Sequence, residues 1–300
     1  MKRVLLAGAS GHLGQEIAKE LKAKGYFIRA LTRNENNFNK IQDNIDETFV
    51  GDVTKKETLK NICKDIDMVI SCLGASVTTR LKDLSHTFHN TDFKGNLNLL
   101  REAVGNKIEK FIYVSVFQPD NDKSLKNLAY VDAHVKFENE LKKSGLNYSI
   151  IRPNAFFSAM REIFDLIKTL GIFFVIGKGD KKTNPIHNND LAKFCVDSIT
   201  KDNFESSVGG SKVYTRKEVA QISFKALGKK SRIFNTPAFL ANFSSFLMNP
   251  IKYRLIAMST FIIKVMQIDM VAPTYGAQIL EDYFDELANN ELNAPVHNKA

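Results

Sequence analysis

Short apolar segments alternate with amphipathic segments through the first half of the chain. The amphipathic segments repeat their apolar positions every three or four residues, which is the period of a helix. An alternation of strands and helices predicts a parallel sheet with helices on both faces. We predict strands at residues 4–7, 26–31, 47–50, 67–73, 110–116 and 147–151. Helices are predicted between them, at residues 15–21, 34–44, 55–64, 84–105 and 125–144.

The regular alternation of strands and helices ends after Arg152-Pro153, and beyond it we predict more helices than strands. Thr215 and Glu218 have the spacing of a capping box, which predicts a helix from Thr215 through Leu227. The chain thus divides into an α/β domain over residues 1–152 and a small, mainly helical lobe over residues 153–300. In the lobe we expect helices at 155–170, 189–200 and 275–287, a strand at 172–176, and a strand near 204–214 that returns to the sheet.

Three glycines follow the first predicted strand at three-residue spacing. Gly8 permits a tight turn, Gly11 lets a pyrophosphate approach the backbone, and Gly14 lets the helix pack closely on the strand. The unpaired amides and the positive end of the helix dipole then face the phosphates. A turn without a ligand is the alternative to this dinucleotide site. The residues predicted to form the site are Gly8, Ser10, Gly11, His12, Leu13 and Gly14.

The end of the second strand indicates which dinucleotide is bound. NAD-preferring sites usually place Asp or Glu there to accept hydrogen bonds from the adenosine ribose. In this chain Thr32-Arg33-Asn34 stands at that place, and the first acid is Glu35. A guanidinium at Arg33 can bind a 2′-phosphate through two charge-assisted hydrogen bonds. We therefore predict NADP(H), with a solvated Arg33 as the alternative.

Further cofactor contacts are expected beyond the carboxyl ends of the other strands, where open α/β sheets bind ligands. Asp52 and Val53 are predicted to contact the adenine, although an Asx turn or a helix cap at Asp52 is equally open. Leu73 and Gly74 are predicted beside the adenosine ribose and pyrophosphate. Pro153 and Phe156 are predicted near the nicotinamide, with simple aromatic packing as the alternative for Phe156.

The net charge is +9, but lysine and arginine are scattered along the chain, so no nucleic acid partner is expected. The three cysteines, Cys63, Cys72 and Cys195, are far apart, and they predict a reducing cytoplasm and no metal site. The first strand begins almost at Met1, which leaves no room for a signal peptide. The apolar segment 239–266 is interrupted by Asn249-Pro250, Lys252 and Arg254, so a peripheral membrane contact is not favoured.

As a set, these motifs resemble the atypical short-chain dehydrogenase/reductases over about residues 1–225. Within them the chain is similar to the NmrA-like and divinyl-chlorophyllide-reductase-like branch of NAD(P)H-binding proteins. The resemblance implies a Rossmann-like doubly wound parallel sheet, a small C-terminal lobe on the substrate side, and NADP(H). It rests on the glycine turn and on segments 32–34, 51–53, 71–76, 113–115, 150–153, 184–187 and 190–192.

The resemblance also implies catalytic residues. Members of this family use Ser or Thr after the fifth strand, and Tyr and Lys four residues apart on the next helix. The tyrosine is the acid or base, and the lysine lowers its pKa and binds the nicotinamide ribose. Ser115 fits the first position and Lys136 the lysine, but Asp132 stands four residues before Lys136. Tyr130 is six residues before Lys136, roughly 240° around an ideal helix.

Lys136 is therefore predicted to bind ribose, and an ion pair with Asp132 or Glu140 is its alternative. Tyr130 is a weaker candidate for the proton donor, and His134 is expected on the helix surface. His187 is expected to order its loop rather than to act in catalysis.

These features lead to three hypotheses for a cytoplasmic protein. The first is an NADPH-dependent reductase of a small apolar or conjugated carbonyl or alkene substrate. The second is a non-catalytic NADP(H) sensor that acts through a protein partner, because the usual Tyr–Lys pair is missing. The third and weakest is a membrane-associated assembly factor that uses residues 239–266. A homodimer is left open.

Overall fold

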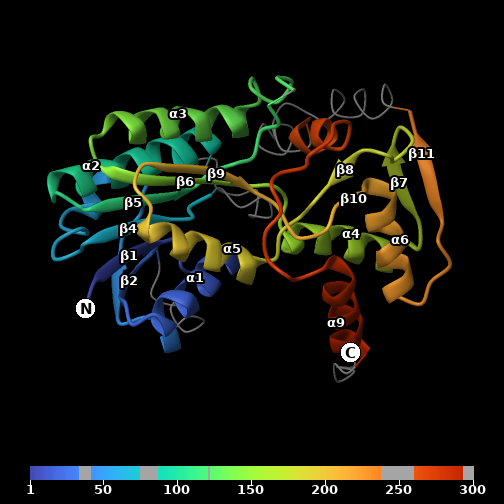
Figure 1. Ribbon diagram of the computed structural model, residues 1–300, viewed down its shortest axis with the longest axis horizontal. Coiled ribbons are helices and arrows are strands. Elements are labelled where there is room, and N and C mark those ends of the chain that lie inside the picture. The colour runs from blue at the N-terminus through green and yellow to red at the C-terminus, as the bar shows by residue number, and fades with distance from the viewer. Residues whose placement is uncertain (34–41, 75–86, 121, 238–259, 293–300) are drawn as a thin grey trace.

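The computed structural model describes residues 1–33, 42–74, 87–120, 122–237 and 260–292. Its centre is a seven-stranded parallel sheet in the order β3-β2-β1-β4-β5-β6-β9 (Figure 1). The Rossmann-like fold and the six predicted strands of the first half are confirmed. The strands are β1 (Arg3–Ala7), β2 (Phe27–Thr32), β3 (Glu47–Val50), β4 (Met68–Ser71), β5 (Lys110–Val114), β6 (Asn147–Pro153) and β9 (Phe204–Val208).

Helices cover both faces of this sheet (Figure 1). The helices α1 (His12–Ala23) and α5 (Asn188–Asp197) lie on one face, and α2 (Asn96–Gly105) and α3 (Ala129–Lys143) lie on the other. Successive residues of a strand point to opposite faces, so Leu6 packs under α1 and α5, and Leu5 packs under α2 and α3. The central strands are consequently apolar at nearly every position.

Some predicted element boundaries were wrong. The predicted helix 55–64 contains only the short 3-10 helix η3 (Lys56–Leu59), because Asn61 and Asp65 take left-handed conformations with φ of 69° and 58°. The π-helix η4 (His89–Gly95) precedes α2, and α3 begins at Ala129 rather than at 125. Strand β6 continues through Pro153, whose carbonyl accepts a hydrogen bond from Phe117 N at 3.1 Å.

The lobe is built mainly from α4 (Phe157–Leu170), α6 (Arg216–Ala226) and α9 (Leu280–Leu292). These helices share a core that includes Phe164 of α4, Val219 of α6 and Phe284 of α9. The predicted capping box is present, with Glu218 N donating to Thr215 Oγ1 at 3.1 Å. The remaining elements are strands β7 (Phe173–Ile176), β8 (Lys182–Thr183), β10 (Tyr214–Thr215) and β11 (Ile233–Thr236), and short 3-10 helices η2 (Gln42–Asn44) and η5 (Ser198–Thr200).

The buried amide of Asn184 joins the lobe to the end of the sheet. Its Nδ2 donates to the carbonyls of Gly210 and Ala272, at 3.2 and 2.8 Å. Its Oδ1 accepts from Asn154 Nδ2 at 2.9 Å and from Ala272 N at 3.0 Å. Because this one side chain satisfies four polar partners, it fixes how the segment around Ala272 crosses the carboxyl end of β6.

None of the helices in the described part of the chain combines the length and the hydropathy that a membrane-spanning segment needs. Most of the segment 239–266, where a peripheral membrane contact is possible but not favoured, lies outside the described residues. The predicted helix 34–44 and the start of the predicted helix 84–105 also lie partly outside them.

Candidate cofactor site and active site

The turn between β1 and α1 is closed so tightly that two of its positions require glycine. Gly8 has φ of 93°, and Gly11 N donates to Gly8 O at 3.0 Å. A Cβ on Gly14 would lie 2.1 Å from Gly8 O, and one on Gly8 would lie 2.8 Å from Cys72 O. These neighbours are backbone atoms, so they cannot move aside as a flexible side chain could. The turn thus brings the start of α1 directly onto β1 and β4.

The N-terminus of α1 is open to a ligand. The first intrahelical bond runs from Gln15 N to Gly11 O at 3.0 Å, so the amides of His12, Leu13 and Gly14 have no acceptor within the helix. In this fully described turn no side chain caps the helix and no acidic residue occupies the first turn. Gly11 is exposed, which leaves its backbone accessible. Amides without an acceptor in the helix, together with the helix dipole, fit a pyrophosphate, so the residues present fit a dinucleotide.

Arg33 and Asp52 follow β2 and β3, as predicted. Arg33 is exposed, beside the buried Thr32. Asp52 forms an Asx turn in which Oδ1 accepts from Thr54 N at 2.9 Å and from Thr54 Oγ1 at 2.8 Å. Val53 is buried, and its carbonyl accepts from Asn98 Nδ2 at 2.9 Å. The 2′-phosphate and adenine contacts of these residues stay predictions.

Two further predicted pairs lie at the ends of β4 and β6. Leu73 is half-buried, and the exposed Gly74 comes close to η4, because a Cβ there would lie 3.6 Å from Asp92 Oδ1. Pro153 is buried at the last position of β6. Phe156 is half-buried at the N-cap of α4 and packs against the core on the α1 side, so the packing alternative describes it. Its contact with nicotinamide stays a prediction.

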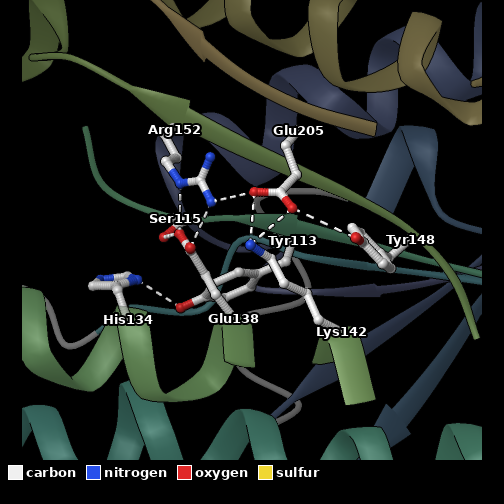
Figure 2. Close-up of polar contacts among 8 residues, drawn as sticks. All are labelled: Tyr113, Ser115, His134, Glu138, Lys142, Tyr148, Arg152 and Glu205. Atoms are coloured by element: carbon white, nitrogen blue, oxygen red, sulfur yellow. Dashed lines mark hydrogen bonds and ion pairs between the residues drawn. The ribbon is translucent and has the colours of Figure 1, made fainter. Parts of the chain in front are cut away.

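Ser115 belongs to a partly buried charge network beyond the end of β5 (Figure 2). Its Oγ donates to Glu138 Oε1 at 2.5 Å, and Arg152 binds both oxygens of Glu138 at 2.9 and 2.6 Å. Arg152 also contacts Glu205 at 2.7 Å, and Lys142 contacts Glu205 at 2.8 Å. Burial opposes the charge of Arg152, but hydrogen bonds to Glu138 and Glu205 outweigh it and raise the pKa of Arg152. The network joins α3 to β5, β6 and β9.

Lys136 forms an ion pair with Asp132 on the outer side of α3. The Nζ–Oδ2 distance is 2.8 Å, and the two side chains are 50% and 45% exposed. This is the ion-pair alternative that the sequence left open, with Asp132 rather than Glu140 as the partner. The ribose role of Lys136 stays a prediction, and it requires the ammonium to leave Asp132.

The inner side of α3 holds a pair that the sequence analysis missed. Tyr130 and His134 are four residues apart, and their rings meet edge to face with centroids 4.8 Å apart. The expectation that His134 lies on the surface was wrong, because the residue is only 3% exposed. Tyr113 OH lies 2.5 Å from its Nδ1, and Asp92 Oδ1 lies 3.5 Å from its Nε2. The sequence signal that could have placed His134 on the inner side of α3 is its four-residue spacing from Tyr130.

The two rings have opposite pKa shifts but are both neutral near pH 7. Burial lowers the pKa of His134 to about 3. Burial, and then the charge of Asp92, raise the pKa of Tyr130 above its ordinary value. Tyr130 is also packed edge to face against Phe88 and Phe261, with centroids 5.2 and 4.9 Å away. Tyr130 is therefore a half-buried phenol, protonated at neutral pH and packed mainly against aromatic rings.

His187 has the loop-ordering position that the sequence predicted. It is the N-cap of α5, and its Nδ1 accepts from Asn189 N at 3.2 Å.

A family model described as NAD(P)H-binding matches residues 8–202. The chain belongs to this NAD(P)H-binding family. The predicted resemblance to the atypical short-chain dehydrogenase/reductases is confirmed, and NAD(P)H is the cofactor of the fold. The match includes the glycine turn, the end of β2 and the whole of α3.

The curated relatives of this NAD(P)H-binding protein include a reductase and an assembly factor. It is 29% identical to the chloroplastic divinyl chlorophyllide a 8-vinyl-reductase of Cucumis sativus, over 96% of this chain and 77% of that protein. It is 23% identical to the photosystem II assembly factor Ycf39 of Trieres chinensis, over 79% of this chain and 73% of that protein. The sequence identity of this chain to the reductase is thus only slightly higher than its identity to the assembly factor.

Solved structures agree on the fold. An NADPH-dependent quinone oxidoreductase of Escherichia coli, complexed with NADPH, has a TM-score of 0.71 at 15% identity, over 95% of this chain and 99% of that one. The triphenylmethane reductase of a Citrobacter species has a TM-score of 0.71 at 17% identity, over 96% of this chain and 99% of that one.

Proposed function

We propose that this protein is an NADPH-dependent reductase that saturates a conjugated alkene or carbonyl group of a small, largely apolar substrate. The observation that carries the proposal is Tyr130, a half-buried phenol packed among the rings of Phe88, His134 and Phe261 on the helix that follows β5. NADPH, when bound, supplies a hydride. Tyr130 supplies the proton, so hydride and proton together add across one double bond and NADP+ is released.

The remaining residues bind and orient. The amides at the start of α1 hold the pyrophosphate, and Arg33 holds the 2′-phosphate. Ser115 donates its proton to Glu138, so towards a substrate or a ribose it offers only the lone pairs of Oγ. Lys136 is kept as a candidate for the ribose. The similarity to a protein named for reduction of a vinyl group supports an alkene as the reducible group.

The test is a screen of enones, quinones and aldehydes in which NADPH oxidation is followed by absorbance. At least one acceptor should be reduced by the wild-type protein. Tyr130→Phe should lower kcat by about 10²-fold or more, because the proton donor is lost, and should change the NADPH dissociation constant little. A Tyr130→Phe variant with wild-type kcat on that acceptor would contradict the role of Tyr130. No turnover of any acceptor would contradict the reductase proposal.

A second candidate is an NADP(H) sensor that acts through a protein partner. Two observations support it. The fourth residue after Tyr130 is His134 rather than a lysine, and the chain is similar to proteins named as assembly factors. Tight NADPH binding without turnover, together with a change of association state between NADPH and NADP+ in analytical ultracentrifugation, would favour it over the enzyme.

A further inference from the structure

Three buried polar side chains from different elements meet behind Tyr130. Asp92 comes from η4, Tyr113 from β5 and His134 from α3, and their exposures are 0%, 0% and 3%. Tyr113 OH lies 2.5 Å from His134 Nδ1, and Asp92 Oδ1 lies 3.5 Å from His134 Nε2 (Figure 2 shows the first contact). The three side chains form a chain of polar contacts, which we name the Asp92–His134–Tyr113 relay.

The partners determine the tautomer of His134. If Nδ1 carried the proton, the lone pair of Nε2 would face the carboxylate of Asp92, which is unfavourable. If Nε2 carries the proton, it faces that carboxylate, and Tyr113 can donate its hydroxyl proton to Nδ1. The second arrangement satisfies both contacts. At 3.5 Å the contact with Asp92 is electrostatic rather than a full hydrogen bond, and among the described residues Nε2 has no other acceptor.

The relay holds the ring against which Tyr130 packs. His134 is held by Tyr113 at Nδ1 and faces Asp92 at Nε2, and its ring packs against Tyr130, as do the rings of Phe88 and Phe261. Asp92 also reaches towards the loop after β4, since its Oδ1 would lie 3.6 Å from a Cβ on Gly74. The relay therefore connects the helix that carries Tyr130 to a loop predicted to line the cofactor.

The charges around Tyr130 favour the phenol over the phenolate. In the described part of the chain, the titratable groups that face Tyr130 and His134 are Asp92 from η4 and Tyr113 from β5, with Glu138 beyond Tyr113. A carboxyl group or a phenol cannot carry a positive charge, so none of these three side chains favours the phenolate. A lysine at the position of His134 would instead place a positive charge four residues from Tyr130 and stabilise the phenolate.

We propose that the Asp92–His134–Tyr113 relay positions Tyr130 and keeps it protonated up to alkaline pH. It does so because a neutral imidazole ring stands where a cation would favour the phenolate. His134 and Asp92 are positioning residues, because they act through Tyr130. The inference rests on the proposed reductase function for its catalytic consequence, but the protonation state of the relay can be measured without any substrate.

The first experiment is nitrogen-15 NMR of the six histidines, with His134→Gln to assign the resonance. We expect His134 to stay neutral from pH 5 to 9 with the proton on Nε2, and Tyr113→Phe to shift its Nδ1 resonance. A His134 that titrates near its ordinary pKa of about 6.5, or that carries its proton on Nδ1, would overturn the relay. This result is independent of whether the protein turns over a substrate.

The second experiment measures pH profiles of NADPH oxidation for wild type, His134→Ala and His134→Lys. Wild type should show no alkaline loss of kcat below about pH 10, the ordinary pKa of tyrosine. His134→Lys should lose kcat between about pH 8 and 10, and His134→Ala should lower kcat about 10²-fold with the KM for NADPH within about threefold. Lys143→Ala, on the exposed side of the same helix, is the matched control.

The outcomes separate the two proposals. If His134→Lys folds and keeps the wild-type pH profile, or if His134→Ala lowers only the melting temperature, the positioning role is wrong although the reductase proposal stands. If no acceptor is reduced, the reductase proposal fails, and ultraviolet titration of tyrosine decides the inference. In that titration His134→Lys should ionise one more tyrosine near pH 9 than wild type, and His134→Lys/Tyr130→Phe should not.

Discussion

The glycine turn after β1 and the inner side of α3 are assembled in different ways. The turn is made by residues close together in sequence, from Gly8 to Gly14, and its close neighbours from elsewhere include backbone atoms such as Cys72 O. The inner side of α3 is surrounded by side chains from distant parts of the sequence, including Asp92, Tyr113 and Arg152. Spacing along the chain therefore specifies the first site, whereas the second exists only after the sheet has formed.

The largest effect is expected from an alanine at the turn. Gly14→Ala would place a methyl group 2.1 Å from Gly8 O and 2.8 Å from Ala9 Cα, so α1 must move away from β1. We expect NADPH affinity, measured by calorimetry, to fall more than about 100-fold, because the amides no longer converge on the pyrophosphate. Gly105→Ala is the control, since a Cβ there meets nothing within 4 Å. Wild-type affinity in Gly14→Ala would mean that the turn does not bind the cofactor.

Substitutions in the charge network beneath α3 should lower the stability of the protein and should have little direct effect on cofactor binding. Glu138→Ala leaves the guanidinium of Arg152 without its main partner, although Glu205 still contacts it. Uncompensated buried charge of this kind costs about 3 kcal/mol in the free energy of unfolding, measured with urea. Lys142→Ala removes only a partly exposed partner of Glu205, and should cost less than about 1 kcal/mol. Equal losses in the two variants would show that burial of Glu138 is not what matters.

This contrast explains how far the sequence could predict the molecule. The strand–turn–helix pattern around Gly8 and the capping box at Thr215 depend on neighbours in sequence, so their positions were predicted closely. The burial of His134 was not predicted, because its partners Tyr113 and Asp92 lie far from it in the sequence. One helix carries both Lys136 and His134, and only the packed sheet shows which side of it faces inward.

Arg33 sharpens the comparison within the cofactor site, because it is predicted to select the cofactor rather than to form the turn. Arg33→Ala should weaken NADPH binding by at least about tenfold through loss of charge-assisted hydrogen bonds to the 2′-phosphate. NADH affinity should be unchanged, since NADH lacks that phosphate. Calorimetry with both nucleotides measures the two values. Equal losses of affinity for NADPH and NADH would mean that Arg33 supports the fold of the loop and does not bind the 2′-phosphate.

The smallest effect is a pH dependence in the network of α3. Burial raises the pKa of Glu205, but hydrogen bonds from Lys142 and Arg152 outweigh it, so the pKa of Glu205 is lowered on folding. A carboxyl group with a lowered folded pKa stabilises the protein above its unfolded pKa of about 4.3, and that contribution is lost as the pH falls through the folded value. Unfolding free energies of wild type and Glu205→Gln should therefore differ at pH 7 and converge below about pH 4. A constant difference across that range would show that Glu205 acts through packing, and the network would then resemble the turn in depending on shape rather than on charge.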